Sequence, residues 1–345
     1  MSNKLKIGIV GCGTIADIQA QAIQQSGNLE LVSLYSRSEQ NARRMGEKFN
    51  VRWHTDWDAF IADPLIDAVS ICTPSGNHLD YGEMAARAGK HVIVEKPIEV
   101  TIERAKRLIQ VCEENHLALA VIYQSRFIPE IEKAKKELDK HAIGKLIIAD
   151  ANIKWFRGQD YYDSGAWRGT FALDGGGVLI NQAIHTIDLF QWFMGDVKSI
   201  YGKIATLTHE RLEGEDNAMA VVEFKSGTFG IITGSTSIQP AQPRHIELHG
   251  KKGSIIIDGD DVRILKSGDE TPRQEKGKSM GASSPLQGFS IEPHKKQFEA
   301  IANAISKGHE PPVSGKESLK SLAIVLGIYE SSKTGLPVDI DNLLK

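Results

Sequence analysis

The sequence predicts an α/β protein of two domains, and three features of its 345 residues lead to this fold class. Short apolar runs alternate with helical patterns as far as about residue 125, which is typical of an open parallel sheet covered on both faces. Strand candidates then follow one another with few helices between them, and Gly and Asp mark the turns. We therefore expect a doubly wound domain at residues 1–125 and an α+β domain with a large open, mostly antiparallel sheet at residues 126–345.

The elements of the first domain follow from its apolar runs. Each run is apolar throughout rather than at alternate positions, as in parallel strands buried on both faces. We expect strands at residues 6–10, 29–35, 68–72, 91–94 and 118–122, and helices at 16–25, 39–49, 81–88 and 101–115.

The second domain is predicted to be rich in strands. Residues 267–288 are polar, rich in Gly, Ser and Lys and without a period, so we expect a surface loop there. We expect helices at 131–140, 178–193, 293–306 and 316–333, and strands at 146–153, 199–207, 218–224, 228–235, 245–248, 254–257 and 263–265.

Composition excludes several classes of protein. With 41% hydrophobic and 25% charged residues and a net charge of -3, the chain is typical of a globular protein and offers no basic patch for nucleic acid. No apolar run approaches the roughly 18 residues of a membrane span, and no signal peptide is recognisable, so we expect a cytoplasmic protein. Cys12, Cys72 and Cys112 are spaced neither as a disulfide framework nor as a zinc site, and no metal is expected.

A glycine-rich turn follows the first strand directly and begins a helix. Gly11-Cys12-Gly13-Thr14-Ile15-Ala16 matches the pattern G-x-G-x-x-G/A. In that pattern the first glycine makes the tight turn, the second lets the backbone approach a pyrophosphate, and the small third residue allows close helix packing. We predict a Rossmann domain that binds a dinucleotide through this turn; the alternative is a glycine turn in another doubly wound fold.

The end of the second predicted strand bears on the choice of dinucleotide. An Asp or Glu there would bind the ribose hydroxyls of NAD, but the sequence has Ser36 and Arg37. A hydroxyl and a guanidinium suit the 2′-phosphate of NADP, and Arg43 and Arg44 follow nearby. We expect NADP, with NAD as the alternative, since Arg37 could instead stack on the adenine of either cofactor.

A second motif, Glu95-Lys96-Pro97, ends the predicted strand 91–94. Ligands of open α/β sheets bind at the carboxyl ends of the strands, so Lys96 is placed where a cofactor would lie. A lysine in a partly desolvated crevice can take part in proton transfer. From spacing alone, a solvated lysine at a strand end explains the motif equally well.

Four motifs in this order resemble the glucose–fructose oxidoreductase, inositol dehydrogenase and MocA (Gfo/Idh/MocA) family over nearly the whole chain. They are the glycine turn, residues 73–78 (Thr-Pro-Ser-Gly-Asn-His), residues 88–97, and residues 175–188 with three glycines at their start. The resemblance implies an NAD(P)-dependent oxidoreductase in which Lys96 is the active-site lysine and His185 the acid/base. It also adds to the expected cofactor-binding residues Thr73, Pro74, Asn77, His78 and Glu95.

The predicted helix 178–193 carries a polar stripe on an otherwise apolar surface. Asn181, His185 and Asp188 are spaced i, i+4 and i+7, so they share one face of an α-helix. Buried polar groups need partners, and a substrate is one such partner; a hydrogen-bonded structural histidine is the alternative. Many relatives, the inositol dehydrogenases among them, have Asp where Asn181 stands. Asn cannot take a proton, so we expect Asn181 to orient a substrate hydroxyl.

Further substrate-binding candidates lie at the domain junction and before the glycines. Arg126 is expected near cofactor or substrate, or in an interdomain salt bridge. Aromatic faces suit a sugar ring, and arginines suit a phosphate or carboxylate, although the same residues could bury a subunit interface. These candidates are Trp155, Arg157, Trp167 and Arg168.

Together these features predict hydride transfer between nicotinamide and a secondary alcohol or ketone of a sugar, sugar derivative or polyol. Residues 126–345 would bind this substrate and, through an uncovered sheet face, form a homo-oligomer, a dimer or a tetramer. No nucleic-acid or membrane partner is expected. Two alternatives stay open: a glycosidase that uses its cofactor for transient oxidation, and a non-catalytic nucleotide-sensing regulator.

Overall fold

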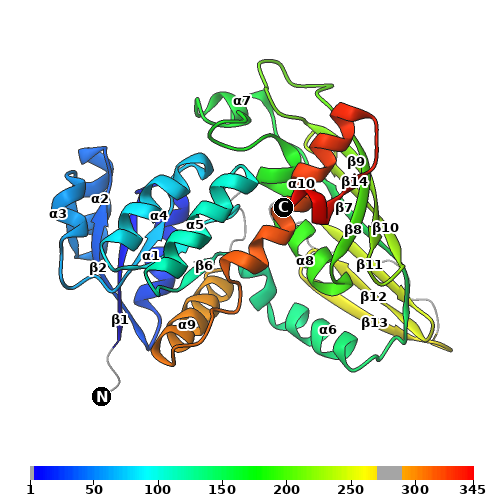
Figure 1. Ribbon diagram of the computed structural model, residues 1–345, viewed down its shortest axis with the longest axis horizontal. Coiled ribbons are helices and arrows are strands. Elements are labelled where there is room, and N and C mark those ends of the chain that lie inside the picture. Colours follow the sequence, from blue (N-terminus) through cyan, green and yellow to red (C-terminus); the bar gives the residue numbers. More distant parts are fainter. Residues whose placement is uncertain (1–3, 270–289) are drawn as a thin grey trace. The chain divides into compact units, whose positions relative to one another are not determined.

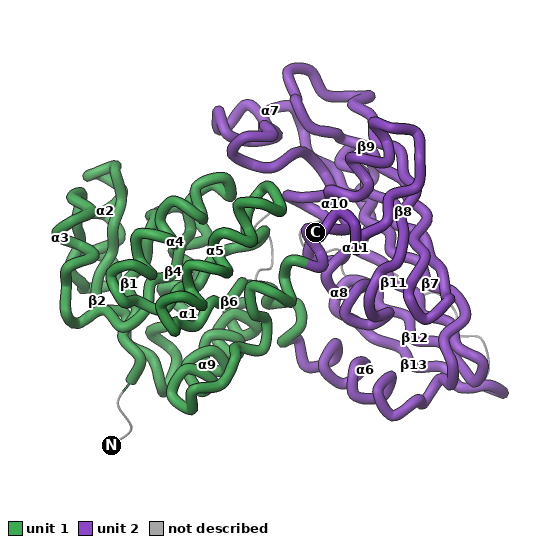
Figure 2. The backbone as a smooth tube through the Cα atoms, viewed as in Figure 1, with its two compact units in different colours: residues 1–127, 290–319 green, residues 128–289, 320–345 purple. Residues whose placement is uncertain are grey.

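The structure, a computed structural model, describes residues 4–269 and 290–345, so most of the predicted loop 267–288 lies outside the described residues. The chain forms two compact units, shown in Figure 2. Unit 1 contains residues 1–127 and 290–319, and unit 2 contains residues 128–289 and 320–345. Within the described ranges, no helix is both long and apolar enough to cross a membrane.

Unit 1 is built on a six-stranded parallel sheet in the order β3-β2-β1-β4-β5-β6 (Figure 1). This is the strand order of a Rossmann fold. The strands are β1 (Leu5–Val10), β2 (Leu29–Tyr35), β3 (Arg52–His54), β4 (Ala68–Ile71), β5 (His91–Val94) and β6 (Leu119–Val121). The helices are α1 (Thr14–Gln24), α2 (Glu39–Phe49), α3 (Trp57–Ile61), α4 (His78–Arg87) and α5 (Ile102–Glu114), with short 3-10 turns η1 (Ser75–Asn77) and η2 (Gln124–Phe127).

Every strand predicted in this domain is present. The sequence missed β3 and α3, because Arg-Trp-His has no apolar run and the five residues of α3 are too few to show a period.

The domain boundary drawn from the sequence differs from the structure at one place. Helix α9 (Glu292–Ser306), expected in the second domain, belongs to unit 1. Its buried side chains Phe298, Ile301 and Ala302 join the same apolar cluster as Ile9 of β1 and Ala20 of α1. Strand and helix patterns show where elements begin and end, but not which core a late helix completes.

Unit 2 is built on an eight-stranded sheet in the order β13-β12-β11-β7-β10-β9-β8-β14. Only the pair β7 and β10 is parallel, so the predicted mostly antiparallel sheet is confirmed. The strands are β7 (Leu146–Lys154), β8 (Val197–Ala205), β9 (Asn217–Phe224), β10 (Phe229–Ser235), β11 (His245–Gly250), β12 (Gly253–Asp258), β13 (Asp261–Lys266) and β14 (Val338–Asp339). Helices α6 (Pro129–Asp139), α7 (Gln159–Asp163), α8 (Ile184–Met194) and α11 (Ile340–Leu343) complete it, and α10 (Gly315–Thr334) enters it from unit 1.

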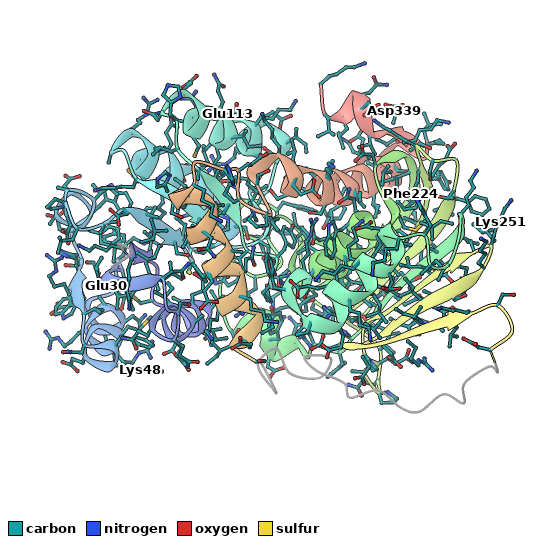
Figure 3. The ribbon with its side chains drawn as sticks, turned by 90° about the horizontal axis from the view of Figure 1, so that it is seen from below. Glu30, Lys48, Glu113, Phe224, Lys251 and Asp339 are labelled. Atoms are coloured by element: carbon teal, nitrogen blue, oxygen red, sulfur yellow. The ribbon has the colours of Figure 1, made fainter. Side chains whose placement is uncertain are left out.

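The two faces of this sheet differ. One face is covered by α8, where Phe190 meets Phe224 of β9 with ring centroids 5.5 Å apart (Phe224 is labelled in Figure 3). We call the other face the open face. Large apolar side chains lie exposed on it, and the strand register places three of them in one row across β8, β9 and β10: Tyr201, Val221 and Ile231.

The helix predicted at 178–193 begins with a wider turn than an α-helix has. Residues Val178–Ala183 form a π-helical segment, η3, and α8 continues directly from it. Asn181 therefore lies in the π-helical turn and His185 in the α-helix. Both are half-buried, whereas Asp188 is fully buried. The wider turn changes the spacing between Asn181 and His185 from that of an ideal α-helix, while His185 and Asp188 keep α-helical spacing.

Candidate active site

The glycine turn between β1 and α1 has the geometry that a dinucleotide requires. Gly11 has φ +96°, and a Cβ there would lie 2.8 Å from the carbonyl oxygen of Cys72. Gly13 is the N-cap of α1, and no atom lies within 4 Å of the position of its missing Cβ. Exposed Thr14 and half-buried Ile15 begin the helix. The N-terminus of α1 is thus open beside Gly13, which fits the approach of a pyrophosphate to a helix start.

Ser36 and Arg37, the two residues expected to select the cofactor, differ in their contacts at the end of β2. Arg37 is exposed, whereas the Ser36 hydroxyl accepts a hydrogen bond from the Ser38 N–H at 3.2 Å. Arg44 donates to the carbonyl oxygen of Cys12 in the glycine turn at 3.3 Å. Arg43 instead forms an ion pair with Glu39 at 2.6 Å. Arg37 is thus an exposed guanidinium beside this strand end, and its contact with a cofactor stays a prediction.

A buried hydrogen-bond chain connects the motif around Lys96 to α1. Gln19 donates to Glu95 Oε1 at 2.5 Å and accepts from the Ser70 hydroxyl at 2.6 Å. The second oxygen of Glu95 accepts from the Lys96 N–H at 3.2 Å. Burial raises the pKa of Glu95, which the nearby Lys96 opposes. Glu95 is thus held inside unit 1, while the half-buried Lys96 follows the carboxyl end of β5.

His78 joins the two sequence motifs of this edge. It is fully buried, with Nδ1 2.9 Å from the carbonyl oxygen of Pro97 and Nε2 3.2 Å from that of Thr73. Burial lowers the pKa of His78, so we expect a neutral ring that donates to one carbonyl at a time. The half-buried Thr73, Pro74 and Asn77 lie on the loop that His78 anchors.

In unit 2, Asn181 belongs to a network of polar side chains. It donates from Nδ2 to Asp174 Oδ1 at 2.5 Å, and its Oδ1 accepts from Gln182 at 2.7 Å. Gln182 also donates to the Tyr161 hydroxyl at 2.8 Å, which accepts from Arg168 at 2.7 Å. The network brings two predicted site residues together, Asn181 and Arg168, through Tyr161 of the aromatic and basic segment and through Gln182, which the sequence did not single out.

In the aromatic and basic segment, which contains Trp155, Arg157, Trp167 and Arg168, each arginine stacks on an aromatic ring. The Arg168 guanidinium lies 4.4 Å from the ring centroid of Tyr161 and 4.6 Å from that of Trp167. The Arg157 guanidinium lies 5.3 Å from the ring centroid of Trp155, and Arg157 as a residue is only 3% exposed. These cation–π contacts fix the arginines beside flat apolar faces.

The backbone at Arg157 is held by His209 and, through it, by Asp216. The carbonyl oxygen of Arg157 lies 2.8 Å from Nε2 of His209, whose Nδ1 lies 3.0 Å from Asp216. Burial would raise the pKa of Asp216, but the backbone N–H groups of Leu207 and Thr208 and its side-chain partners lower that pKa well below its ordinary value. Asp216 therefore stays ionised and holds His209 in place.

Arg126 lies in unit 1 and forms an ion pair. The guanidinium is 3.1 Å from Glu317, and the Arg126 side chain is 5% exposed. Both partners belong to unit 1, so this is an ion pair within one unit, whereas the sequence had offered an interdomain bridge. A substrate contact for Arg126 stays a prediction.

Sequence reasoning missed the residues that hold these candidates. Gln19, Asp174 and Gln182 each bond directly to a predicted site residue. Asp174 directly precedes the three glycines, which is the one signal that could have drawn attention to it. No spacing rule predicts a bond between Gln19 and Glu95, because the two residues are brought together only by the fold.

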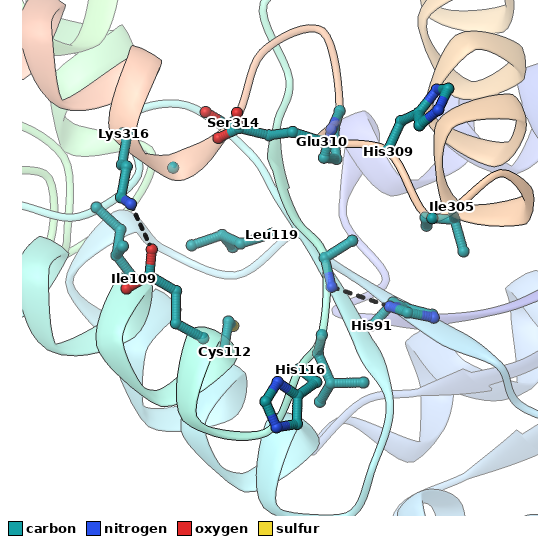
Figure 4. Close-up of a pocket in the computed structure, with 16 residues that line it drawn as sticks. His91, Ile109, Cys112, His116, Leu119, Ile305, His309, Glu310, Ser314 and Lys316 are labelled. Atoms are coloured by element: carbon teal, nitrogen blue, oxygen red, sulfur yellow. Dashed lines mark hydrogen bonds and ion pairs between the residues drawn. The ribbon is translucent and has the colours of Figure 1, made fainter.

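A cavity of about 410 Å³ lies at the opposite edge of the unit 1 sheet (Figure 4). It is lined at the amino ends of β5 and β6 by His91, Ala118 and Leu119, and by the end of α5, where burial raises the pKa of Cys112 to about 12. The cofactor motifs lie at the carboxyl edge, so this cavity is separate from them. Within residues 4–269 and 290–345, no group of three or more His, Cys, Asp or Glu side chains is arranged to hold a metal ion.

Comparison with protein families matches both parts of the chain. Residues 5–123 match the Gfo/Idh/MocA oxidoreductase family with an NAD-binding Rossmann fold. Residues 131–256 match the Gfo/Idh/MocA C-terminal domain. The two matches follow one another in the order that the sequence motifs indicate.

Individual relatives cover nearly the whole chain. A scyllo-inositol 2-dehydrogenase (NAD+) of Bacillus subtilis is 28% identical over 99% of this chain and 98% of its own length. A D-xylose 1-dehydrogenase [NADP+] of Haloarcula marismortui is 25% identical over 98% of this chain and 94% of its own. The solved structure of the WlbA dehydrogenase from Bordetella pertussis, in complex with NADH and UDP-GlcNAcA, is 29% identical, with a TM-score of 0.86 over 98% of this chain and 99% of that one.

The two glycines of the turn give a paired prediction. Replacing Gly13 by Ala should cost at most about 1 kcal/mol of unfolding free energy, since its φ of -84° suits alanine and the space is open. The new methyl group would occupy that space, so NAD(P)H affinity should fall at least tenfold. Fluorescence titration and urea unfolding measure the two effects.

Replacing Gly11 by Ala is the contrasting variant. It should lose stability as well as affinity, because φ +96° and the Cys72 carbonyl both oppose a Cβ. Unchanged NAD(P)H binding by the Gly13→Ala variant would contradict the assignment of this turn to the cofactor.

Proposed function

Because the chain belongs to the Gfo/Idh/MocA oxidoreductase family, we propose that it oxidises a secondary alcohol of a sugar, sugar derivative or polyol, or reduces the corresponding ketone, with NAD(P). The observation that carries the proposal is the carboxyl edge of the unit 1 sheet. There no atom fills the space beside Gly13 at the N-terminus of α1. Lys96 follows β5, which is separated from β1 in the sheet only by β4. The inositol and xylose dehydrogenases among the relatives support the substrate class.

The residues of unit 1 fit the cofactor in distinct ways. When bound, the nicotinamide supplies the hydride acceptor or donor of the reaction. The backbone of Gly11, Gly13, Thr14 and Ile15 would hold the pyrophosphate. Thr73, Pro74 and Asn77 would line the next part of the site. His78 and Glu95 are buried, so they would act by positioning this loop and Lys96.

Proton transfer is assigned to residues of both units. In the oxidation direction, neutral His185 would accept the hydroxyl proton of the substrate. Lys96 would donate a hydrogen bond to the same oxygen and stabilise the negative charge that develops there. Asn181 would orient that hydroxyl, with its amide held by Asp174 and Gln182.

The aromatic and basic segment of unit 2 would bind the remainder of the substrate. Trp155 and Trp167 offer flat faces to the apolar side of a sugar ring. Arg157 and Arg168 would bind polar or anionic substituents, and Arg126 is a further candidate. Supporting this role, Arg168 is linked to Asn181 through Tyr161 and Gln182.

NADP is the proposed cofactor, which leads to a binding prediction. Cofactor-stripped protein titrated with NADPH and NADH and followed by nicotinamide fluorescence should bind NADPH more tightly. Replacing Arg37 by Ala should raise the Kd for NADPH about tenfold or more, because a charge-assisted hydrogen bond to the 2′-phosphate is lost. The matched control is Arg43→Ala, since Arg43 is already paired with Glu39. Tighter NADH binding would show that Ser36 and Arg37 do not select NADP.

The catalytic assignment predicts a loss of kcat/KM when Lys96 or His185 is replaced. With a sugar identified by screening, Lys96→Ala and His185→Ala should each lower kcat/KM about a hundredfold or more. The exposed His309 provides the control, and His309→Ala should retain activity. Near-wild-type turnover by the Lys96 variant would refute the assignment. Hydrolysis of a glycoside without net reduction of cofactor would point instead to the glycosidase chemistry.

The open face is the proposed subunit interface. Met219, Val221 and Tyr201 are 63%, 51% and 52% exposed there, and an apolar patch of this kind is usually covered in an assembly. We propose a homo-oligomer, a dimer or tetramer, formed through this face. The cytoplasmic location stays a prediction, consistent with three buried free thiols.

Replacing Val221 by Asp tests the interface. A charge in the middle of the row Tyr201, Val221 and Ile231 should shift the sedimenting species toward the monomer. The matched control is Leu65→Asp, a 43% exposed leucine in unit 1, which should leave the mass unchanged. An unchanged mass for the Val221 variant would exclude this face as the interface.

A further inference from the structure

A single buried residue holds the start of the helix that carries Asn181 and His185. Glu215 is 1% exposed. Its Oε2 accepts from the Gly177 N–H at 3.1 Å, and its Oε1 accepts from the Leu179 N–H at 2.7 Å. Its own carbonyl oxygen accepts from the Val178 N–H at 2.8 Å. Glu215 therefore satisfies three consecutive N–H groups that a helix start leaves without partners inside the helix.

Helix α10 completes this arrangement. The Tyr329 hydroxyl donates to Glu215 Oε1 at 3.1 Å. No side-chain cap acts at Gly177, the residue that precedes η3, so the carboxylate of Glu215 takes that function from a distant part of the chain. A negative charge at this position also suits the positive end of the helix dipole.

The same contact explains two of the three glycines before η3, Gly176 and Gly177, and also Gly214. A Cβ on Gly177 would collide with the backbone of Glu215, and a Cβ on Gly176 would collide with the Tyr329 hydroxyl. A Cβ on Gly214 would collide in turn with the backbone of Gly176 and Gly177. Glycine is required here because two backbone segments and a tyrosine approach one another more closely than any side chain allows.

We propose that Glu215 is a positioning residue for the reaction: its ionised carboxylate, with Tyr329, clamps the first turn of the helix so that Asn181 and His185 meet the substrate correctly. The inference rests on the roles proposed above for Asn181 and His185. The link to Asn181 is short, since the Asn181 N–H donates to the carbonyl oxygen of Gly177, whose own N–H Glu215 holds.

We call the bonds of the Glu215 carboxylate to Gly177, Leu179 and Tyr329 the clamp, and protonation of Glu215 should loosen it. Burial raises the pKa of Glu215 to about 7, against the bonds from Leu179, Tyr329 and Gly177, which lower it. Three donors bond to the carboxylate, and a proton on it removes the negative charge that strengthens those bonds. Above its pKa the clamp is complete, and as the pH falls through about 7 it loosens.

The other titratable groups around Glu215 lie on two helices, α7 and α10, and on the loops that hold Asp174 and Asp216. Tyr329 of α10 and Tyr162 of α7 both have pKa values raised first by burial and further by the charge of Glu215. Asp174 contributes to the raised pKa of Tyr329 but bonds to Asn181 and to the Gly169 N–H. Neighbouring Asp216 is bonded to residues 207–209 instead. Burial moves the pKa of Glu215 toward neutral pH, whereas it moves those of the two tyrosines further above it.

The test compares wild-type protein with Glu215→Gln across pH. At pH 8.5 the variant should have kcat/KM about ten- to a hundredfold lower, because misplaced groups cost that much. At pH 6 wild-type Glu215 is largely protonated and therefore uncharged, like Gln. The ratio of wild-type to variant kcat/KM should then approach 1. The control Glu210→Gln makes the same chemical change at an 84% exposed side chain and should give a ratio near 1 throughout. A ratio that stays constant with pH would overturn the proposal.

Tyr329→Phe gives a second, milder variant in case Glu215→Gln folds poorly. Loss of the hydroxyl donor raises the pKa of Glu215, so the acid-side loss of kcat/KM should begin about one pH unit higher than in wild type. An unshifted profile would count against the clamp.

Hydrogen–deuterium exchange separates this inference from the proposed function. Peptides covering residues 177–185 should exchange faster in Glu215→Gln than in wild type at pH 8.5, and this difference should vanish near pH 6. Peptides from β1 and α1 serve as the internal reference. Failure to find a sugar substrate would count against the proposed function alone, whereas equal exchange at both pH values would overturn the clamp.

Discussion

The placement of Lys96 depends on one buried chain of hydrogen bonds at the carboxyl edge of the unit 1 sheet. Ser70 of β4 and Gln19 of α1 fix the carboxylate of Glu95, and that carboxylate holds the N–H of Lys96. Buried polar groups are costly unless they are satisfied, so such a chain allows few alternative arrangements. Reactive groups at strand ends would otherwise be as mobile as the loops that bear them.

In unit 2, buried acids hold the candidate residues in place. Its candidate residues lie on a helix start and on a loop, and each is tied to a buried acid: Asn181 to Asp174, the helix start to Glu215, and the Arg157 loop through His209 to Asp216. These acids differ in charge state, because Asp216 has a strongly lowered pKa whereas burial raises that of Glu215 to about 7. Glu215 and Asp216 are neighbours in the chain and both are buried, yet their pKa values are shifted in opposite directions.

The sequence predicted the architecture well and the support of the site poorly, for a physical reason. Apolar runs and glycine turns are local signals, so the strands of both sheets other than the short β3 and β14, the turn at Gly11 and Gly13 and the helix with His185 could be found. The bonds from Gln19 to Glu95 and from Glu215 to Leu179 join residues that lie 76 and 36 positions apart. The π-helical turn at 178–183 begins beside the contact with Glu215, and a periodicity argument assumes that such turns do not occur.

Helix α9 has a consequence for how the protein is made. Phe298, Ile301 and Ala302 complete the core of unit 1, yet they leave the ribosome after nearly the whole of unit 2. The nucleotide-binding unit therefore cannot close its core during synthesis of its own first 127 residues. Each unit is completed only by the C-terminal part of the chain, unit 1 by residues 290–319 and unit 2 by residues 320–345. A truncated chain ending before residue 290 would leave the apolar cluster of unit 1 without Phe298, Ile301 and Ala302.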